Sequence, residues 1–225
     1  MQLAQIQQLE KEHGDTMPIM VYSDLAVVDE QLTLIHPSFQ QYQGIQHVAD
    51  FPLSLLIGQN LATGCGMLVN YALLENCLPL PNEAVVHDWW ISLIVAALGK
   101  VGYIEKPLTY YRQHAANQIG VVKIDPSILF DKVACTAFLT KNTKNFLDCL
   151  NQARALATHL RALEKNEVAD YAESYATLLQ KPLFERINTL FHYEFCKQGL
   201  LRRLAFYFRV LVLNKFLLNR LSPKI

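Results

Sequence analysis

Strand-like segments are confined to roughly the first 125 residues of this chain. They are short apolar runs bounded by proline, glycine or acidic residues, a pattern typical of buried strands. The runs lie at residues 18–23, 101–104 and 108–112. Residues 25–30 extend the first run or begin another strand, and Lys106-Pro107 predicts a turn between the last two. An amphipathic helix is expected before them, at residues 1–13.

The remainder of the chain predicts helices alone. Beyond about Pro126 no strand-like run occurs, and Pro182 suits the first position of a helix. Helical patterns follow one another at residues 127–163, 167–179 and 182–195. The sequence therefore predicts an α/β fold at residues 1–125, an all-helical region at 126–196 and a separate basic helix at 197–225.

Composition narrows the class of protein further. The 225 residues are 52% hydrophobic and 10% aromatic, which supports a sizeable core and excludes general disorder. Five cysteines, with no C-x-x-C pair, favour reduced thiols in a cytoplasmic protein over a disulfide framework or a zinc site. The first residues lack the pattern of a signal peptide, and no apolar run approaches the length of a membrane span.

A formal net charge of zero hides an asymmetry between the two ends of the chain. Residues 197–225 contain seven basic residues and no acidic one, whereas the first 196 hold 13 basic and all 20 acidic residues. On a helix, Arg202, Arg209 and Arg220 fall on one line, opposite a side formed mainly by leucines. This pattern predicts a helix on an anionic membrane surface. The alternative is that the apolar side of this helix packs on the protein's own helices. The chain has no nucleic-acid-binding motif, so no nucleic-acid partner is expected.

His87-Asp88-Trp89-Trp90 opens an apolar run that ends at Gly99. The run predicts a short buried helix stopped by a glycine, with Asp88 at or near its N-terminus. A carboxylate there accepts hydrogen bonds from free backbone N–H groups and is held in one direction. Such a group suits a general base that takes a proton from a bound hydroxyl. The simpler alternative is that Asp88 only caps the helix and the tryptophans are core.

Four blocks, in this order, resemble family 2 glycosyltransferases, and especially the rhamnosyltransferase-like group that builds bacterial surface polysaccharides. The resemblance covers about residues 1–125. The blocks are Tyr22-Ser23-Asp24 with Asp29-Glu30, Asn60-x-x-Thr63-Gly64-x-Gly66, His87-Asp88-Trp89-Trp90, and Tyr111-Arg112-Gln113-His114-x-x-Asn117-x-x-Gly120.

The resemblance implies a type A nucleotide-sugar transferase fold, a doubly wound α/β sandwich. It implies transfer of a sugar, for which rhamnose is the first guess, from a nucleotide-sugar to a surface-polysaccharide or lipid-linked glycan, with inversion at the anomeric carbon. A divalent cation, magnesium or manganese, would stabilise the departing diphosphate. Such an enzyme works in the cytoplasm or on the inner face of the cytoplasmic membrane.

The resemblance also assigns roles to individual residues. Asp88 matches the base; Trp89 or Trp90 would form a wall against the acceptor sugar, with the other ring in the core. Gly64 matches the acceptor-side loop, where it shapes the backbone. Arg112 and His114 match a segment that would bind diphosphate oxygens or assist the metal. The alternative is that Arg112 pairs with a surface acid and His114 is a loop residue.

Two further expectations concern the role of Asp24 and the part of the family's fold that this chain matches. Asp24 follows a strand and is expected to be structural rather than a metal ligand. The family's donor-binding half, with its aspartate-rich metal motif, would precede a helix that matches residues 1–13, so this chain matches the acceptor-side part alone and no metal ligand is certain. A non-catalytic remnant or interaction module is therefore the alternative. A metal hydrolase using His87, Asp88 and His114 is disfavoured because no H-E-x-x-H spacing occurs.

Overall fold

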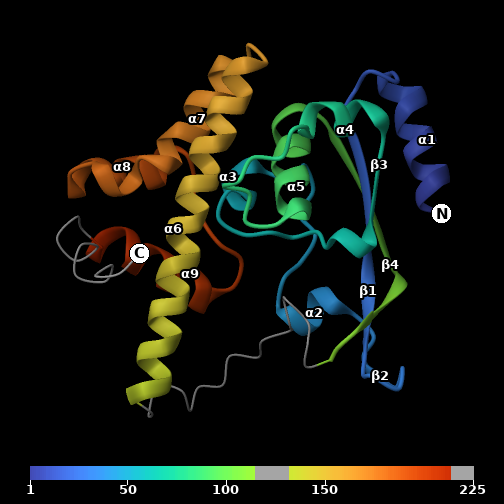
Figure 1. The fold of residues 1–225 in the computed structure, drawn as a ribbon, viewed down its shortest axis with the longest axis horizontal. Helices are drawn as coiled ribbons and strands as arrows, with labels where there is room; N and C mark the ends of the chain where they lie inside the picture. Colours follow the sequence, from blue (N-terminus) through green and yellow to red (C-terminus); the bar gives the residue numbers. More distant parts are fainter. Residues whose placement is uncertain (115–131, 214–225) are drawn as a thin grey trace. The chain divides into compact units, whose positions relative to one another are not determined.

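A computed structural model describes residues 1–114 and 132–213, and within residues 132–141 it describes the backbone alone. Figure 1 shows a mixed α/β chain, as predicted. It divides into two compact units. Residues 1–56 and 60–123 form unit 1, and residues 57–59 and 124–225 form unit 2.

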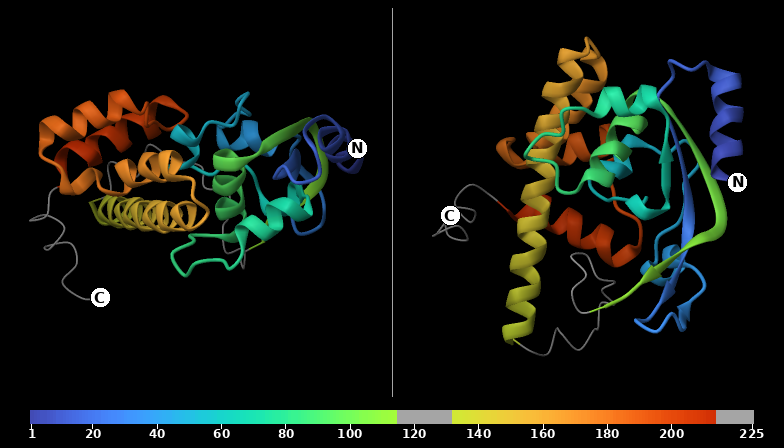
Figure 2. Two further views of the ribbon diagram at one scale, coloured as in Figure 1. Left: turned by 90° about the horizontal axis from the view of Figure 1, so that it is seen from above. Right: turned by 45° about the vertical axis from the view of Figure 1, so that its right-hand side comes forward.

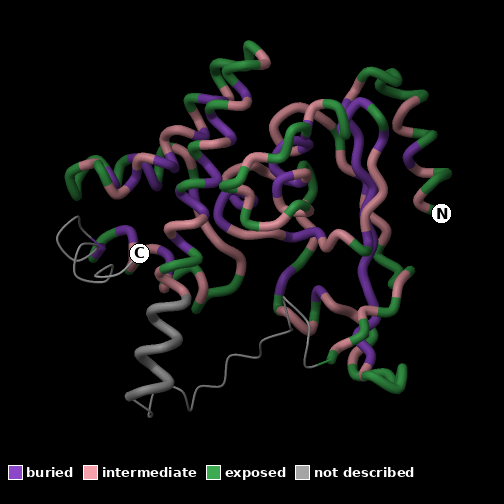
Figure 3. Tube along the Cα trace, in the orientation of Figure 1, coloured by how far each residue is buried: buried purple, intermediate pink, exposed green. Residues whose placement is uncertain are grey.

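Unit 1 is organised around one buried central strand, which pairs antiparallel with two short strands and parallel with a long one. The strands are β1 (Ile19–Val28), β2 (Leu34–His36), β3 (Met67–Val69) and β4 (Lys100–Arg112). All ten residues of β1 are buried, and Figure 3 shows this as a nearly continuous buried stretch. Strands covered on both faces are expected to be apolar throughout, and β1 is, except at Ser23 and Asp24.

The structure decides between the two alternatives for the first strand, and it corrects the prediction for the last two. β1 continues through Asp24 to Val28, so residues 25–28 extend the first strand. The expected turn at Lys106-Pro107 is absent, and β4 is a single strand of 13 residues. Its register with β1 shifts between Ser23 and Asp24, which pairs with Pro107. A bulge of this kind accommodates a proline, which has no N–H to donate, without ending the strand.

Helices lie on both faces of this sheet. Figure 2 shows α1 on one side of the strands and α5 on the other. On the α1 side, Ile6 packs with Ile19 and Val21 of β1. The elements are α1 (Gln2–His13), α2 (Phe39–Gln43), α3 (Leu53–Leu56), the 3-10 turn η1 (Gly64–Gly66), α4 (Tyr71–Cys77) and α5 (His87–Leu98). The predictions at residues 1–13 and from His87 to Gly99 are therefore confirmed.

Gly99 ends α5 for a reason different from the expected one. Its φ of −137° is extended, so no left-handed glycine cap is formed. A Cβ at this position would lie 2.0 Å from the carbonyl oxygen of Pro18. That oxygen accepts a hydrogen bond from Lys100 N at 2.9 Å, which begins the pairing of β4 with β1. Gly99 is required because two backbones pass in close contact.

Unit 2 contains helices and turns but no strand among its described residues. They are α6 (Lys132–Ala162), α7 (Asn166–Ala176), the 3-10 turn η3 (Leu178–Gln180), α8 (Leu183–His192) and α9 (Leu200–Val212). Tyr175 is fully buried, and its ring contacts Phe195 edge-on and Phe206 face-on, with centroid distances of 5.0 and 6.2 Å. Pro182 precedes α8 as its N-cap instead of occupying the first helical position.

Candidate functional site

Asp88 lies in the first turn of α5, and the N-cap of that helix is Val86. The prediction of a carboxylate near a helix N-terminus is therefore confirmed, while the capping alternative is wrong because the cap position belongs to another residue. The Asp88 carboxylate instead accepts hydrogen bonds from a preceding loop. Asn60 Nδ2 donates to Oδ1 at 3.2 Å, and the backbone N–H of Gly64 donates to Oδ2 at 2.9 Å. Asp88 remains partly exposed.

The loop that holds Asp88 is itself shaped for close approach. A Cβ on Gly64 would lie 2.9 Å from His87 Nε2 and 3.3 Å from Asp88 Cβ. A Cβ on Gly66 would lie 2.9 Å from Leu25 Cδ2. The sequence predicted that backbone passes close to another group at these glycines, and the structure identifies those groups. Two of the four blocks, which are distant in sequence, thus meet at Asp88.

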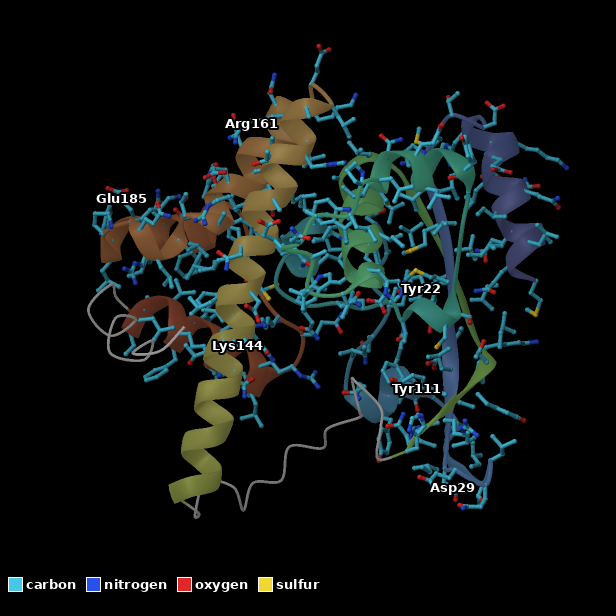
Figure 4. The ribbon with its side chains drawn as sticks, viewed as in Figure 1. Tyr22, Asp29, Tyr111, Lys144, Arg161 and Glu185 are labelled. Atoms are coloured by element: carbon cyan, nitrogen blue, oxygen red, sulfur yellow. The ribbon has the colours of Figure 1, made fainter. Side chains whose placement is uncertain are left out.

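The N-terminus of α5 points toward the carboxyl ends of β1 and β4. This follows because β4 begins directly after α5 and runs in the opposite direction beside it, as Figure 1 shows. Tyr111 and Asp29 lie at that end of the two strands (Figure 4). In α/β proteins, ligands bind most often beyond the carboxyl ends of parallel strands.

Cys65 and Tyr111 share the electrostatic environment of Asp88. Partial desolvation raises the pKa of the Cys65 thiol, and the negative charge of Asp88 raises it further. The pKa of Tyr111 is also raised, first by burial and then by the charges of Cys65 and Asp88. Thr109 Oγ1 lies 3.5 Å from the carbonyl oxygen of Cys65. Sequence reasoning assigned no role to Cys65, Tyr111 or Asn60, although Tyr111 and Asn60 lie inside the quoted blocks.

The two tryptophans differ in burial, and one ring belongs to the core, as predicted. Trp90 is fully buried and donates from Nε1 to the carbonyl oxygen of Cys77 at 3.0 Å, so it belongs to the core. Trp89 is half-buried, and its Nε1 donates to the carbonyl oxygen of Leu56 at 2.7 Å. Of the two rings, only Trp89 retains an exposed surface for a ligand.

Arg112 and His114 are exposed at the end of β4. With Glu30 and Gln31 they line an open depression of about 370 Å³. Asp29 shapes this region, because its Oδ1 accepts hydrogen bonds from Gln31 N at 2.9 Å and from the backbone N–H of Thr33 at 2.8 Å. Residues 117 and 120, which end the fourth block, lie outside the described residues.

Asp24 is a structural carboxylate, in agreement with the prediction. It is 5% exposed, and its Oδ1 accepts hydrogen bonds from Leu25 N at 2.8 Å and Gln40 N at 3.1 Å. Ser38 Oγ donates to its Oδ2 at 2.5 Å. These contacts fix the turn before α2 against β1 and leave little of the carboxylate for a ligand.

The divalent cation that the resemblance implies for a complete enzyme stays a prediction. Among the described residues, no group of three or more histidine, cysteine, aspartate or glutamate side chains is arranged to hold a metal ion. The four cysteines whose side chains the structure describes are free thiols. Within those same parts of the chain, no helix has both the length and the apolar character needed to cross a bilayer.

Comparison of the chain with protein-family models, with curated proteins and with solved structures gives no match in any of the three. The case for an activity therefore depends on the contacts of Asp88 and its neighbours.

Proposed function

We propose that unit 1 is the acceptor-binding part of a glycosyltransferase of the type A nucleotide-sugar class, and that Asp88 takes the proton from the acceptor hydroxyl. One observation carries the proposal. The partly exposed Asp88 carboxylate belongs to the first turn of α5 and accepts hydrogen bonds from Asn60 and Gly64 of the preceding loop. These contacts join two of the blocks on which the resemblance to family 2 glycosyltransferases depends.

The hydrogen bonding of Asp88 leaves room for this chemistry. A carboxylate has about four lone-pair sites for hydrogen bonds. Two are used by Asn60 and Gly64, so an acceptor hydroxyl can donate to the remainder. In the transfer step, the hydroxyl oxygen bonds to the anomeric carbon as the bond from that carbon to the diphosphate breaks. Asp88 receives the proton, and the nucleoside diphosphate leaves with the electron pair.

Neighbouring residues supply binding contacts for the two substrates. The partly exposed ring of Trp89, the residue directly after the base, offers an apolar face for the C–H surface of the acceptor sugar. Arg112 and His114, at the depression beyond β4, offer donors for the diphosphate of the nucleotide-sugar. No step is assigned to a metal ion, because the described residues offer no donor set for one.

A glycan-binding module without transfer activity is the second candidate. Both Asp88 oxygens already accept a hydrogen bond, as they would in a carboxylate that only anchors the loop at residues 60–66. Binding of a glycan without release of nucleoside diphosphate would favour this candidate.

The test is a transfer assay on the full chain. A panel of nucleotide-sugars is combined with lipid-linked glycan acceptors, and acceptor-dependent release of nucleoside diphosphate is measured. Asp88→Asn is expected to lower the rate by about 100-fold to 10,000-fold, the usual contribution of a general base. The matched control is Asp50→Asn, an exposed residue of unit 1 whose φ of 64° asparagine tolerates.

Two outcomes would contradict the proposal. A rate for Asp88→Asn close to that of the native chain would exclude Asp88 as the base. Absence of acceptor-dependent release with every donor and acceptor pair would exclude transfer by this chain.

A further inference from the structure

Helix α9 presents three separate strips of residues. At about 100° per residue, its exposed apolar side chains span an arc of about 120°. They are Leu200, Leu201, Leu204, Phe208, Leu211 and Val212. The core-facing strip consists of Phe206 and Val210, both almost fully buried. Arg203 and Arg209 each lie about 60° beyond one end of this arc; Arg203 is exposed and Arg209 is half-buried.

Helix α8 also has an exposed apolar arc. Phe184 and Phe191 are each 80% exposed, and Leu183 and Ile187 complete an arc of about 100° on the same side of the helix. The opposite part of α8 carries Glu185, which projects from the unit in Figure 4. Monomeric proteins rarely leave so many large apolar side chains in water on one side of a helix, so each of these two arcs is suited to an interaction.

A buried arginine joins the two helices. Arg186 of α8 is 7% exposed, and its Nη1 donates to the carbonyl oxygen of Val210 at 2.9 Å and to that of Leu213. These carbonyls lie at the C-terminal end of α9, where the helix leaves them without intrahelical partners. Arg186 therefore ties α8 to the end of α9. The exposed arcs of the two helices are together called the α8–α9 surface.

We propose that the α8–α9 surface docks on an anionic lipid bilayer. Charge complementarity supports this partner: the sequence from residue 197 to its end has seven basic residues and no acidic one, and Arg203 is exposed beside the apolar arc. An interfacial helix buries its apolar arc among the acyl chains while flanking arginines reach the headgroups. The inference does not depend on the proposed sugar transfer.

The structure corrects the sequence-based description of this helix in part. The alternative in which its leucine side packs on the protein's own helices is wrong for the described residues, because Leu200 is 71% and Leu204 56% exposed. The predicted arginine line is not fully solvated either. Arg202 and Arg209 are half-buried, and burial lowers the pKa of each. Arg220 lies outside the described residues.

A second copy of this chain fits the α8–α9 surface less well. In a two-fold pair, the same surface contacts itself. The two α9 helices would then bring their arginines together, and residues 197–225 contain no carboxylate to pair with them.

Vesicle flotation of the full chain tests the proposal. Phosphatidylcholine vesicles are compared with vesicles that also contain phosphatidylglycerol. The native chain is expected to float with the anionic vesicles alone, and less at high salt. Phe184→Asn combined with Phe208→Asn is expected to weaken binding by about tenfold or more, and Arg203→Gln by about fivefold. The control is Tyr71→Asn, which removes a 72% exposed aromatic ring from α4. Circular dichroism confirms that each variant keeps its helices.

Three results would overturn the proposal. Native-like flotation of the double phenylalanine variant would show that another surface binds lipid. Equal flotation with neutral vesicles would remove the role of the basic residues. A dimer in light scattering that the same double variant abolishes would identify a second copy as the occupant.

Discussion

Asn70 holds together three elements of unit 1, and its removal should destabilise this unit strongly. It is 7% exposed. Its Oδ1 accepts hydrogen bonds from Ile19 N at 2.9 Å and from Leu73 N at 3.0 Å, and its Nδ2 donates to the carbonyl oxygen of Met17 at 2.9 Å. One side chain therefore begins β1, follows β3 and caps α4.

The cost of Asn70→Ala follows from these contacts. Loss of the N-cap contact to Leu73 costs about 1 kcal/mol. The N–H of the fully buried Ile19 loses its partner, which costs a further 1–3 kcal/mol or so. We expect a loss of about 3 kcal/mol in the free energy of unfolding of unit 1. With a urea dependence of about 2 kcal/mol per molar, the unfolding midpoint should fall by about 1.5 M.

The tryptophans make the measurement specific to unit 1. The chain contains two, Trp89 and Trp90, and both lie in this unit. Urea unfolding followed by tryptophan fluorescence therefore reports on unit 1. The control is Asn76→Ala, since Asn76 Nδ2 donates to the carbonyl oxygen of Ala72 within the same helix, and alanine favours that helix. A midpoint for Asn70→Ala within about 0.3 M of the native value would refute this reasoning.

Two further predictions concern Cys65 and Arg186. Because desolvation and the charge of Asp88 raise the pKa of Cys65, its thiolate fraction at about pH 8 is smaller than that of a free cysteine. Asp88→Asn removes the second cause, so alkylation of Cys65 by iodoacetamide should become faster; an unchanged rate would contradict the coupling. Arg186→Met should raise hydrogen exchange in α9 but not in β1, because the carbonyls of Val210 and Leu213 lose their donor. Equal exchange of α9 in both proteins would show that the arginine does not secure the helix.

Local patterns predicted an element of this protein well where the residues that determine it all lie in one short segment. The helix at residues 1–13, the helix from His87 to Gly99 and the buried run from residue 18 all occur in the structure. Periodicity and glycine placement are sufficient for such elements. The extent of β4 was missed because Pro107 predicts a turn locally, whereas pairing with β1 across a bulge continues the strand.

The candidate site needed contacts between distant segments. Asn60 and Gly64 lie 28 and 24 residues before Asp88, and no local pattern predicts that they donate to its carboxylate. Trp89 and Trp90 are neighbouring residues of the same type, yet one ring is buried and the other half-exposed. Which ring is buried depends on which face of α5 meets the sheet.

Sequence alone determined that the C-terminal segment is basic and amphipathic, because charge and helical period are properties of the segment itself. Tertiary structure decided which strip of α9 faces the core. Phe206 and Val210 pack inward, and the leucine arc is left in solvent. The helical period fixes the angle between two strips, but only the surface of the neighbouring helices determines which strip is covered.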